Sequence, residues 1–307
     1  MKTPVAFLIF NRPDTTKKVF AAIRQAQPPK LLVVADGARK DRPGEVEKCR
    51  ATRAIIDRVD WDCEVLTNYS EENLGGMMRI STGLDWVFSL VETAIVLEDD
   101  CLPHPTFFSF CEELLLLYQN DERIMTISGD NFQFGRQRGK YSYYFSRYNH
   151  CWGWATWRRA WQHYDRKLEL WPRIRNDNLI KYIFGDTKGA RYWHKIFQAI
   201  YENKITHGWD YRWTFACWVQ SGLTVLPNVN LISNIGFGKE ATHTINAKSI
   251  MANMSTEEMY FPLQHPPFVV RDAQADEFTQ KTLFDTNVFE RIVRKTRKTL
   301  GLTFSLG

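Results

Sequence analysis

The stretch from Thr93 to Pro103 contains a short apolar run that is followed directly by three acidic residues. Ala94 to Leu97 is apolar without alternation, which is typical of a strand buried on both faces of a parallel sheet. Glu98, Asp99 and Asp100 follow at once. Ligands of open α/β sheets bind just beyond the carboxyl ends of strands, and oxygen ligands suit Mg²⁺ or Mn²⁺. The stretch therefore indicates either a metal site or an acidic turn at a helix start.

The first hundred residues alternate between strand and helix patterns. Buried strands are predicted over Val5–Phe10, Leu31–Ala35 and Cys63–Thr67, with a helix after Asp14 and a charged helix around Glu45–Val59. Strands that alternate with helices are typical of a parallel sheet with right-handed crossovers. We therefore expect an α/β fold with a mostly parallel, Rossmann-like sheet flanked by helices.

Composition narrows the class of protein. The 307 residues are 44% hydrophobic and 24% charged, as in an ordinary globular protein, and the net charge of +5 does not indicate nucleic acid as a partner. No run approaches the roughly 18 apolar residues of a membrane-spanning helix. The six cysteines form no CxxC pair, and no signal peptide precedes them. We expect a reduced cytoplasmic chain.

Polar residues follow each predicted strand. Phe10-Asn11-Arg12 follows the first strand, Asp36-Gly37 the second, and Asn73-Leu74-Gly75 precedes a helix that contains Arg79. Neither GxGxxG nor a P-loop is present, so the ordinary dinucleotide and ATPase signatures are missing. Arg79 is either a surface residue or a group near the carboxyl edge of the sheet that meets a diphosphate.

The order and spacing of these motifs resemble the nucleotide-sugar half of GT-A glycosyltransferases, especially the family 2 type. The resemblance covers roughly the first hundred residues. Glu98-Asp99-Asp100 is also similar to the triplet of N-acetylglucosaminyltransferase I. Two positions depart from the commonest pattern: the triplet stands where many members have Asp-x-Asp, and Ala38 stands where many have Ser.

The resemblance implies a role for each motif. Asp36 would bind uracil, Arg79 the diphosphate, and Glu98 and Asp99 the ribose or donor sugar. Asp100 would ligate Mn²⁺ or Mg²⁺. The remaining residues that we assign to the nucleotide-sugar site are Phe10, Asn11, Arg12 and Asn73.

Residues 104–288 are expected to form an acceptor-binding half, after a nucleotide-sugar-binding half over 1–103. A helix is predicted over Phe107–Tyr118, and strands over Ile124–Ile127, Tyr141–Phe145 and Leu223–Leu226. By resemblance, a loop after the sheet presents aromatic residues to the sugars. The predicted acceptor-binding residues are Asp130, Asn131, Trp152 and Trp154, although either tryptophan would fit equally well in the core.

Asp210 is the candidate general base. It precedes the apolar segment Phe215–Val219, near a predicted helix N-terminus, where the helix dipole favours an ionised carboxylate. Carboxylates at the comparable place in inverting family members deprotonate the acceptor hydroxyl. A helix cap is the alternative role, and Asp130 and Glu240 are the substitute candidates for the base.

His243 is the candidate second metal ligand. It follows the Gly-containing stretch Ile235–Gly238, in the region where many GT-A chains supply a C-terminal ligand. A neutral imidazole beside a carboxylate and a diphosphate suits Mn²⁺ better than Mg²⁺. The alternative is an ordinary surface histidine.

Residues 289–307 form a basic tail with apolar residues at helical spacing. It would either dock on anionic lipid, where a lipid-linked acceptor would be found, or pack as a solvated helix. We expect a cytoplasmic location, with contact at the inner face of the membrane through this tail.

The function expected from these features is metal-dependent transfer of a sugar from a nucleotide-sugar, expected to be a UDP-sugar, to a hydroxyl of a glycan or lipid-linked acceptor with inversion. One alternative is a sugar-phosphate nucleotidyltransferase, which would normally carry an early Gly-rich loop. The other is a non-catalytic carbohydrate-binding protein, which would not need the acidic triplet.

Overall fold

A computed structural model describes residues 1–185, 187–237 and 250–284. The chain divides into two compact units. Residues 1–166 and 206–271 form the first, here called the sheet unit, and residues 167–205 and 272–307 belong to the second, the helical unit. His243 and Glu240, together with the basic tail over 289–307, lie outside the described residues.

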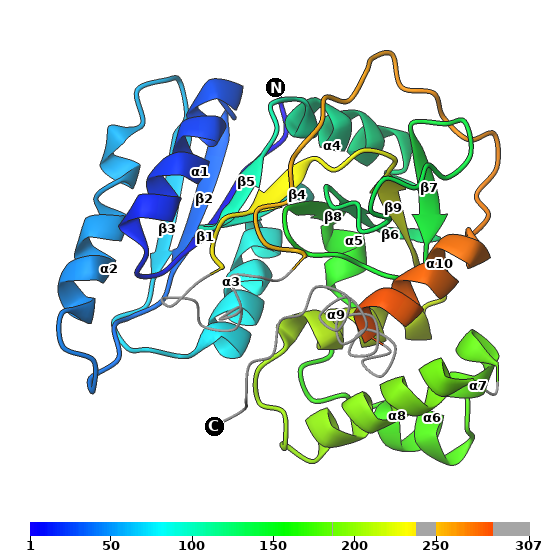
Figure 1. Cartoon of the computed structure of the whole chain (residues 1–307). Helices are drawn as coiled ribbons and strands as arrows, with labels where there is room; N and C mark the ends of the chain where they lie inside the picture. The colour runs from blue at the N-terminus through cyan, green and yellow to red at the C-terminus, as the bar shows by residue number, and fades with distance from the viewer. Residues whose placement is uncertain (186, 238–249, 285–307) are drawn as a thin grey trace, which may run out of the picture. The chain divides into compact units, whose positions relative to one another are not determined.

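An eight-stranded sheet forms the centre of the sheet unit, in the order β3-β2-β1-β4-β8-β6-β9-β7. β3, β2, β1 and β4 pair in parallel. β8 is antiparallel to both β4 and β6, β9 is parallel to β6, and β7 is antiparallel to β9. The strands are β1 (Val5–Ile9), β2 (Lys30–Ala35), β3 (Glu64–Tyr69), β4 (Thr93–Glu98), β6 (Ile124–Ser128), β7 (Tyr143–Ser146), β8 (Trp154–Trp157) and β9 (Leu223–Pro227) (Figure 1).

A second, two-stranded sheet lies at the end of β4. β5 (Cys101–Pro103) pairs antiparallel with β10 (Ile232–Asn234), and Cys101 faces Asn234 in the register. Segments that are 130 residues apart in the sequence are thereby joined beside the acidic triplet, as the adjacent arrows of β5 and β10 show in Figure 1.

Helices cover both faces of the parallel part of the sheet. Val5, Phe7 and Ile9 of β1 belong to one buried cluster with apolar residues of α1 and α4. On the opposite face, α3 packs on β2 closely enough for Gly83 to lie against Val34. This alternation follows from the period of two in a strand. The helices of the sheet unit are α1 (Pro13–Ala26), α2 (Glu45–Arg53), η1 (Ile56–Arg58), α3 (Gly76–Leu90), α4 (Thr106–Leu117), α5 (Arg158–Trp161) and α9 (Trp209–Val219).

The helical unit has its own aromatic core. Trp171 and Trp193 are fully buried, and both contact Phe197 of α8, with ring centroids 5.6 and 5.5 Å apart. The indole nitrogens are satisfied by Gln198 and Gln280, each at 2.9 Å. The elements are α6 (Trp171–Asn176), α7 (Ile180–Phe184), α8 (Lys188–Tyr201), α10 (Ala273–Thr279) and the π-helical turn η2 (Gln280–Phe284).

The predicted fold class is confirmed, since a mostly parallel α/β sheet is flanked by helices in a manner consistent with a Rossmann-like GT-A fold. The predicted boundary between residues 103 and 104 falls inside the sheet unit, between β5 and α4. The two predicted halves therefore stay a functional prediction. Among the described residues, no helix is both long and apolar enough to cross a bilayer.

Candidate functional site at the end of β4

The acidic triplet lies at the carboxyl end of β4, at the point where the chain turns into β5. Glu98 ends β4, and Asp99 and Asp100 form the turn. Both aspartates are buried, at 2% and 7% exposure. The backbone carbonyl of Asp100 accepts a hydrogen bond from Ile235 N at 2.8 Å, so the residues after β10 close over this turn. The predicted placement of the triplet at a strand end is confirmed.

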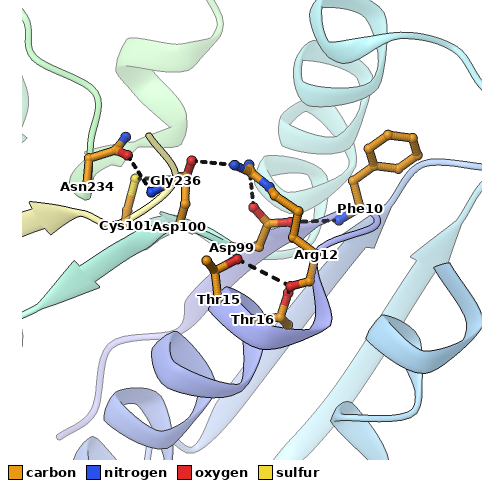
Figure 2. A network of polar contacts seen from close by, with 9 residues as sticks. All are labelled: Phe10, Arg12, Thr15, Thr16, Asp99, Asp100, Cys101, Asn234 and Gly236. Carbon is orange, nitrogen blue, oxygen red and sulfur yellow. Dashed lines mark hydrogen bonds and ion pairs between the residues drawn. The ribbon is translucent and has the colours of Figure 1, made fainter. Parts of the chain in front are cut away.

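Arg12 bridges the two buried aspartates. Its Nη2 donates to Asp99 Oδ1 at 2.7 Å, and its Nη1 donates to Asp100 Oδ2 at 2.9 Å. The second oxygen of Asp99 accepts a hydrogen bond from Phe10 N at 3.2 Å. Figure 2 shows the guanidinium between the two carboxylates. The ends of β1 and β4, which are neighbours in the sheet, are thus linked by two ion pairs.

The carboxyl groups of the triplet disfavour one another's ionisation. Burial raises the pKa of Glu98, and the carboxylates of Asp100 and Asp99 raise it further. Burial likewise raises the pKa of Asp99, while Arg12 opposes this shift. Burial acts to lower the pKa of Arg12, but the carboxylates around it outweigh that effect, so the guanidinium stays charged. One guanidinium therefore faces three carboxyl groups, and a cation of higher charge in its place would stabilise their ionised forms further.

Asn11 and Phe10 are held by a second polar group on the other side of β1. Asn11 Nδ2 donates to Glu45 Oε1 at 2.8 Å, and Glu45 is also paired with Arg39. The Arg39 guanidinium lies over the Phe10 ring, 5.7 Å from its centroid. Sequence analysis did not single out Glu45 or Arg39. Glu45 stands in the first turn of a predicted helix, where an acidic residue is too common to be noticed.

Asp36 organises the turn that precedes α3. Its Oδ1 accepts hydrogen bonds from Gly37 N (3.0 Å) and Leu74 N (2.9 Å). Its Oδ2 accepts from Asn73 Nδ2 (3.1 Å) and Gly75 N (3.0 Å). Gly75 has φ +77°, a conformation that favours glycine. A carboxylate can accept about four hydrogen bonds, and in Asp36 all four come from donors within the protein. Its predicted contact with uracil stays a prediction.

Arg79 is buried against β3. It is 7% exposed, and its Nη2 donates to both the backbone carbonyl and the side-chain oxygen of Asn68. Burial lowers the pKa of Arg79. Its Nε has no hydrogen-bond partner among the described residues. The guanidinium is engaged with the strand in this conformation, and the predicted contact with a diphosphate stays a prediction.

Two of the predicted acceptor-binding residues, Trp154 and Asn131, are buried in the protein. Trp154 is fully buried and packs among Trp161, Trp209 and Trp213. Asn131 is also buried, and its side chain is engaged with the backbone at Pro227 (2.7 Å) and Gln133 (2.8 Å). Both side chains are buried in this conformation, and their predicted contacts with an acceptor sugar stay predictions.

Asp130 lies beneath Trp152 and is not exposed. Its Oδ2 accepts a hydrogen bond from Trp152 N at 3.0 Å, whereas its Oδ1 is buried without a hydrogen-bond partner among the described residues. Burial raises the pKa of Asp130 well above its ordinary value. Burial thus disfavours the ionised form of Asp130, and its predicted contact with an acceptor stays a prediction. Trp152 itself is partly exposed and touches Phe132 and Phe237 edge-on, so its predicted role stays open.

Asp210 lies in the first turn of α9 and is exposed. Its charge contributes to the raised pKa of Glu98 and, after burial, is the first cause of the raised pKa of Cys151. The carboxylate therefore lies within electrostatic range of the triplet, although the two are more than a hundred residues apart in the sequence. Its role as a base stays a prediction.

Asp100 offers a carboxylate as ligand to a divalent cation. The described residues hold no group of three His, Cys, Asp or Glu side chains that would bind a metal by themselves. Sites that use one or two carboxylates together with substrate phosphates are nevertheless the usual kind for Mg²⁺. The guanidinium of Arg12 already lies as a cation against Asp100 Oδ2. The donor chemistry therefore fits a cation that is shared with a phosphate ligand, with Asp100 as its protein ligand.

Comparisons with known proteins give only distant likeness. No protein-family model matches the sequence, and no curated protein matches it. A cytidylyltransferase from Leptospira borgpetersenii serovar Hardjo-bovis (strain JB197) is similar in structure, with 9% identity and a TM-score of 0.33 over 58% of this chain and 73% of that one. Mouse xyloside xylosyltransferase 1, in its apo form, shows 10% identity and a TM-score of 0.28 over 44% and 56%. Likeness at these scores gives no basis for assigning an activity.

Proposed function

We propose that this chain is a glycosyltransferase that moves a sugar from a nucleotide-sugar, a UDP-hexose, to a hydroxyl group of a glycan or lipid-linked acceptor. The observation that carries the proposal is the acidic triplet at the end of β4, next to the polar end of β1 and within electrostatic range of Asp210. Three carboxyl groups with a single guanidinium between them suit a cation and a diphosphate better than they suit a structural turn.

The residues would divide the reaction between them. The donor diphosphate would lie beside Asp100, which would hold Mn²⁺ or Mg²⁺, and beside Arg12, whose planar guanidinium suits phosphate oxygens. A divalent cation bound there would neutralise the charge that develops on the departing diphosphate. Asp210 would take the proton of the attacking acceptor hydroxyl, which leads to inversion in a direct displacement.

Thermal unfolding with nucleotide-sugars tests the donor class. UDP-sugars with Mn²⁺ should raise the melting temperature of the protein, and a ligand at about 100 times its Kd should add roughly 2.7 kcal/mol to the free energy of unfolding. Asp100→Asn should remove this stabilisation, whereas Asp14→Asn, an exposed carboxylate of α1, should preserve it. No stabilisation by any nucleotide-sugar would contradict the proposal.

The products distinguish transfer from nucleotidyl chemistry. A glycosyltransferase incubated with donor and Mn²⁺ releases UDP, whereas a nucleotidyltransferase consumes or releases pyrophosphate. Asp210→Asn should leave UDP-sugar affinity nearly unchanged while transfer falls by roughly 10²- to 10⁴-fold, because the amide cannot accept a proton. Gly208 is the N-cap of α9 and Asp210 lies in its first turn, so a purely structural role of Asp210 through the helix dipole predicts that activity survives.

A further inference from the structure

The backbone of Arg12 is fixed independently of its side chain. Arg12 precedes the first turn of α1, and its carbonyl accepts hydrogen bonds from Thr16 N (3.0 Å), Thr16 Oγ1 (2.7 Å) and Thr15 Oγ1 (3.3 Å). Figure 2 shows both threonines beneath the carbonyl and the side chain extended toward the aspartates. A change of partner by the guanidinium therefore does not require α1 or β1 to move.

The chain after β10 lies against the ion pair. A Cβ atom added at Gly236 would be 2.0 Å from Asp100 Oδ2 and 2.6 Å from Arg12 Nη1. Gly236 N is held by Asn234 Oδ1 at 3.0 Å, and Ile235 N is held by the Asp100 carbonyl. Asp100 Oδ2 thus has the guanidinium on one side and a backbone segment on another, so a second cation has no room at this oxygen.

We propose that Arg12 is a built-in counter-ion that occupies the cation-binding oxygen of Asp100 in the donor-free protein and is displaced when a divalent cation and a diphosphate bind together. This inference rests on the proposed function for the identity of the diphosphate. Arg12 and the metal repel each other and compete for the same oxygen, so a bare cation binds weakly. A diphosphate gives the released guanidinium two new acceptor oxygens.

Because Arg12 and the cation compete for Asp100, binding of the metal and binding of the nucleotide should each strengthen the other. A nucleoside diphosphate that draws Arg12 away from Asp100 raises the affinity for the cation, and by linkage the cation raises the affinity for the nucleotide by the same factor. The alternative is that Arg12 only ties the end of β1 to the turn after β4. In that case its removal lowers stability without increasing the affinity for a metal.

Binding of Mn²⁺ to the nucleotide-free protein separates these two roles. Arg12→Met retains the length of the side chain and removes the charge, so its Mn²⁺ affinity, measured by electron paramagnetic resonance of the free ion, should exceed that of the wild type by at least about tenfold. Adding Asp100→Asn to this variant should abolish the gain. Arg24→Met is the matched control, since Arg24 is ion-paired with Asp60 but both side chains are exposed.

The same titration with UDP present completes the test. The wild type should bind Mn²⁺ more tightly with UDP than without it, and Arg12→Met should show a smaller difference. Arg12→Lys, which retains one charge but cannot span both aspartates, should gain less than Arg12→Met and serves if the latter does not fold. An unchanged or weaker Mn²⁺ affinity in the folded Arg12 variants overturns the inference.

The outcomes also separate this inference from the proposed function. If UDP and Mn²⁺ bind the wild type together but the Arg12 variants gain no affinity for the metal, the counter-ion role fails and the transferase proposal stands. If the variants gain affinity for Mn²⁺ and no uridine nucleotide binds to any form, the competition of Arg12 for Asp100 stands. The proposed donor site, with the release of Arg12 by a diphosphate, then fails.

Discussion

Two carboxylates of the candidate site lie in different surroundings. Asp36 is buried and accepts four hydrogen bonds from the chain, whereas Asp210 is exposed in the first turn of α9. The sequence predicted that Asp36 follows a strand and that Asp210 lies near the N-terminus of a helix, because an apolar run stands beside each residue. The sequence could not predict that a turn nearly forty residues away donates hydrogen bonds to Asp36, since hydrogen bonds between distant segments leave no local sequence pattern.

Asp36→Asn should destabilise the protein through the turn at residues 73–75. Each oxygen of Asp36 faces two N–H donors, so the NH₂ group of an asparagine would meet donors in either orientation. We expect the free energy of unfolding, measured by urea denaturation, to fall by about 1–3 kcal/mol. Asp14→Asn in the first turn of α1 is the control, with a loss of at most about 1 kcal/mol. Equal small losses would show that the turn does not depend on the carboxylate.

The stability of Asp130→Asn relative to the wild type, measured as the free energy of unfolding, should increase as the pH rises. Burial raises the pKa of Asp130 above the ordinary value of 3.8. Above pH 4 the folded protein therefore holds a proton that the unfolded chain releases, and this contribution to stability is lost as the pH rises. Asparagine does not titrate, so the variant does not lose this contribution. The free energy of unfolding of the variant minus that of the wild type should therefore rise by up to about 1.4 kcal/mol per pH unit between pH 5 and 7.

Asp121→Asn is the control for this pH series. The pKa of Asp121 is lowered by a hydrogen bond with Arg123, so its contribution to stability is complete above its unfolded pKa and is lost only as the pH falls below it. The difference between Asp121→Asn and the wild type should stay constant from pH 5 to 7. A constant difference for Asp130→Asn as well would mean that Asp130 is ionised in the folded protein.

At the scale of elements, the sequence predicted strands from apolar runs to within one to two residues. β1, β2, β3, β6, β7 and β9 all overlap their predicted ranges. β8 is the exception. The sequence predicts a loop with sugar-binding residues over the tryptophan-rich run from Trp152 to Trp157, but Trp154–Trp157 forms an antiparallel strand between β4 and β6. A tryptophan is compatible both with burial in a core and with stacking on a sugar. The sequence therefore does not distinguish these two roles, and the strand pairing in the structure does.

Gly83→Ala should destabilise the packing of α3 on β2. Alanine is the better helix former by about 1 kcal/mol, but a Cβ at this position would lie 2.4 Å from Val34 Cγ1. Overpacking of this kind costs about 1–3 kcal/mol, so we expect a net loss in urea unfolding. Gly76→Ala in the same helix is the control, because nothing lies within 4 Å of its added Cβ, and it should be neutral or stabilising.

A double-mutant cycle with Val34→Ala checks the cause. If the loss in Gly83→Ala comes from the contact with Val34, the double variant should be more stable than the sum of the single effects predicts, by about 0.5–3 kcal/mol. Additive effects would place the strain elsewhere.

At the scale of the whole molecule, the sequence did not predict how the chain divides. The predicted division at residue 103 followed the motifs, whereas the sheet unit is discontinuous, with residues 167–205 inserted between its two parts. No Pro-, Gly- or Ser-rich linker marks residues 166 or 206. All described residues proposed for the donor site and for the base, among them Asp36, Asp100 and Asp210, belong to the sheet unit.

The sheet unit should therefore fold and bind donor without the inserted segment. Arg212 holds the two ends of the insertion together, since its Nε donates to Arg166 O (2.8 Å) and its Nη1 to the carbonyls of His207 (3.3 Å) and Gly208 (3.1 Å). Two hydrogen bonds and the width of a guanidinium put these carbonyls within roughly 8 Å of each other, a gap that about four residues span.

A chain that ends at Arg271, with a Gly-Ser linker in place of residues 167–205, should show cooperative unfolding with an m-value reduced in proportion to its smaller size. It should bind UDP with Mn²⁺ within a few-fold of the affinity of the full chain, measured by calorimetry. A folded variant without nucleotide binding would mean that residues outside the sheet unit complete the donor site, and a variant that unfolds without cooperativity would mean that the sheet unit is not an autonomous domain.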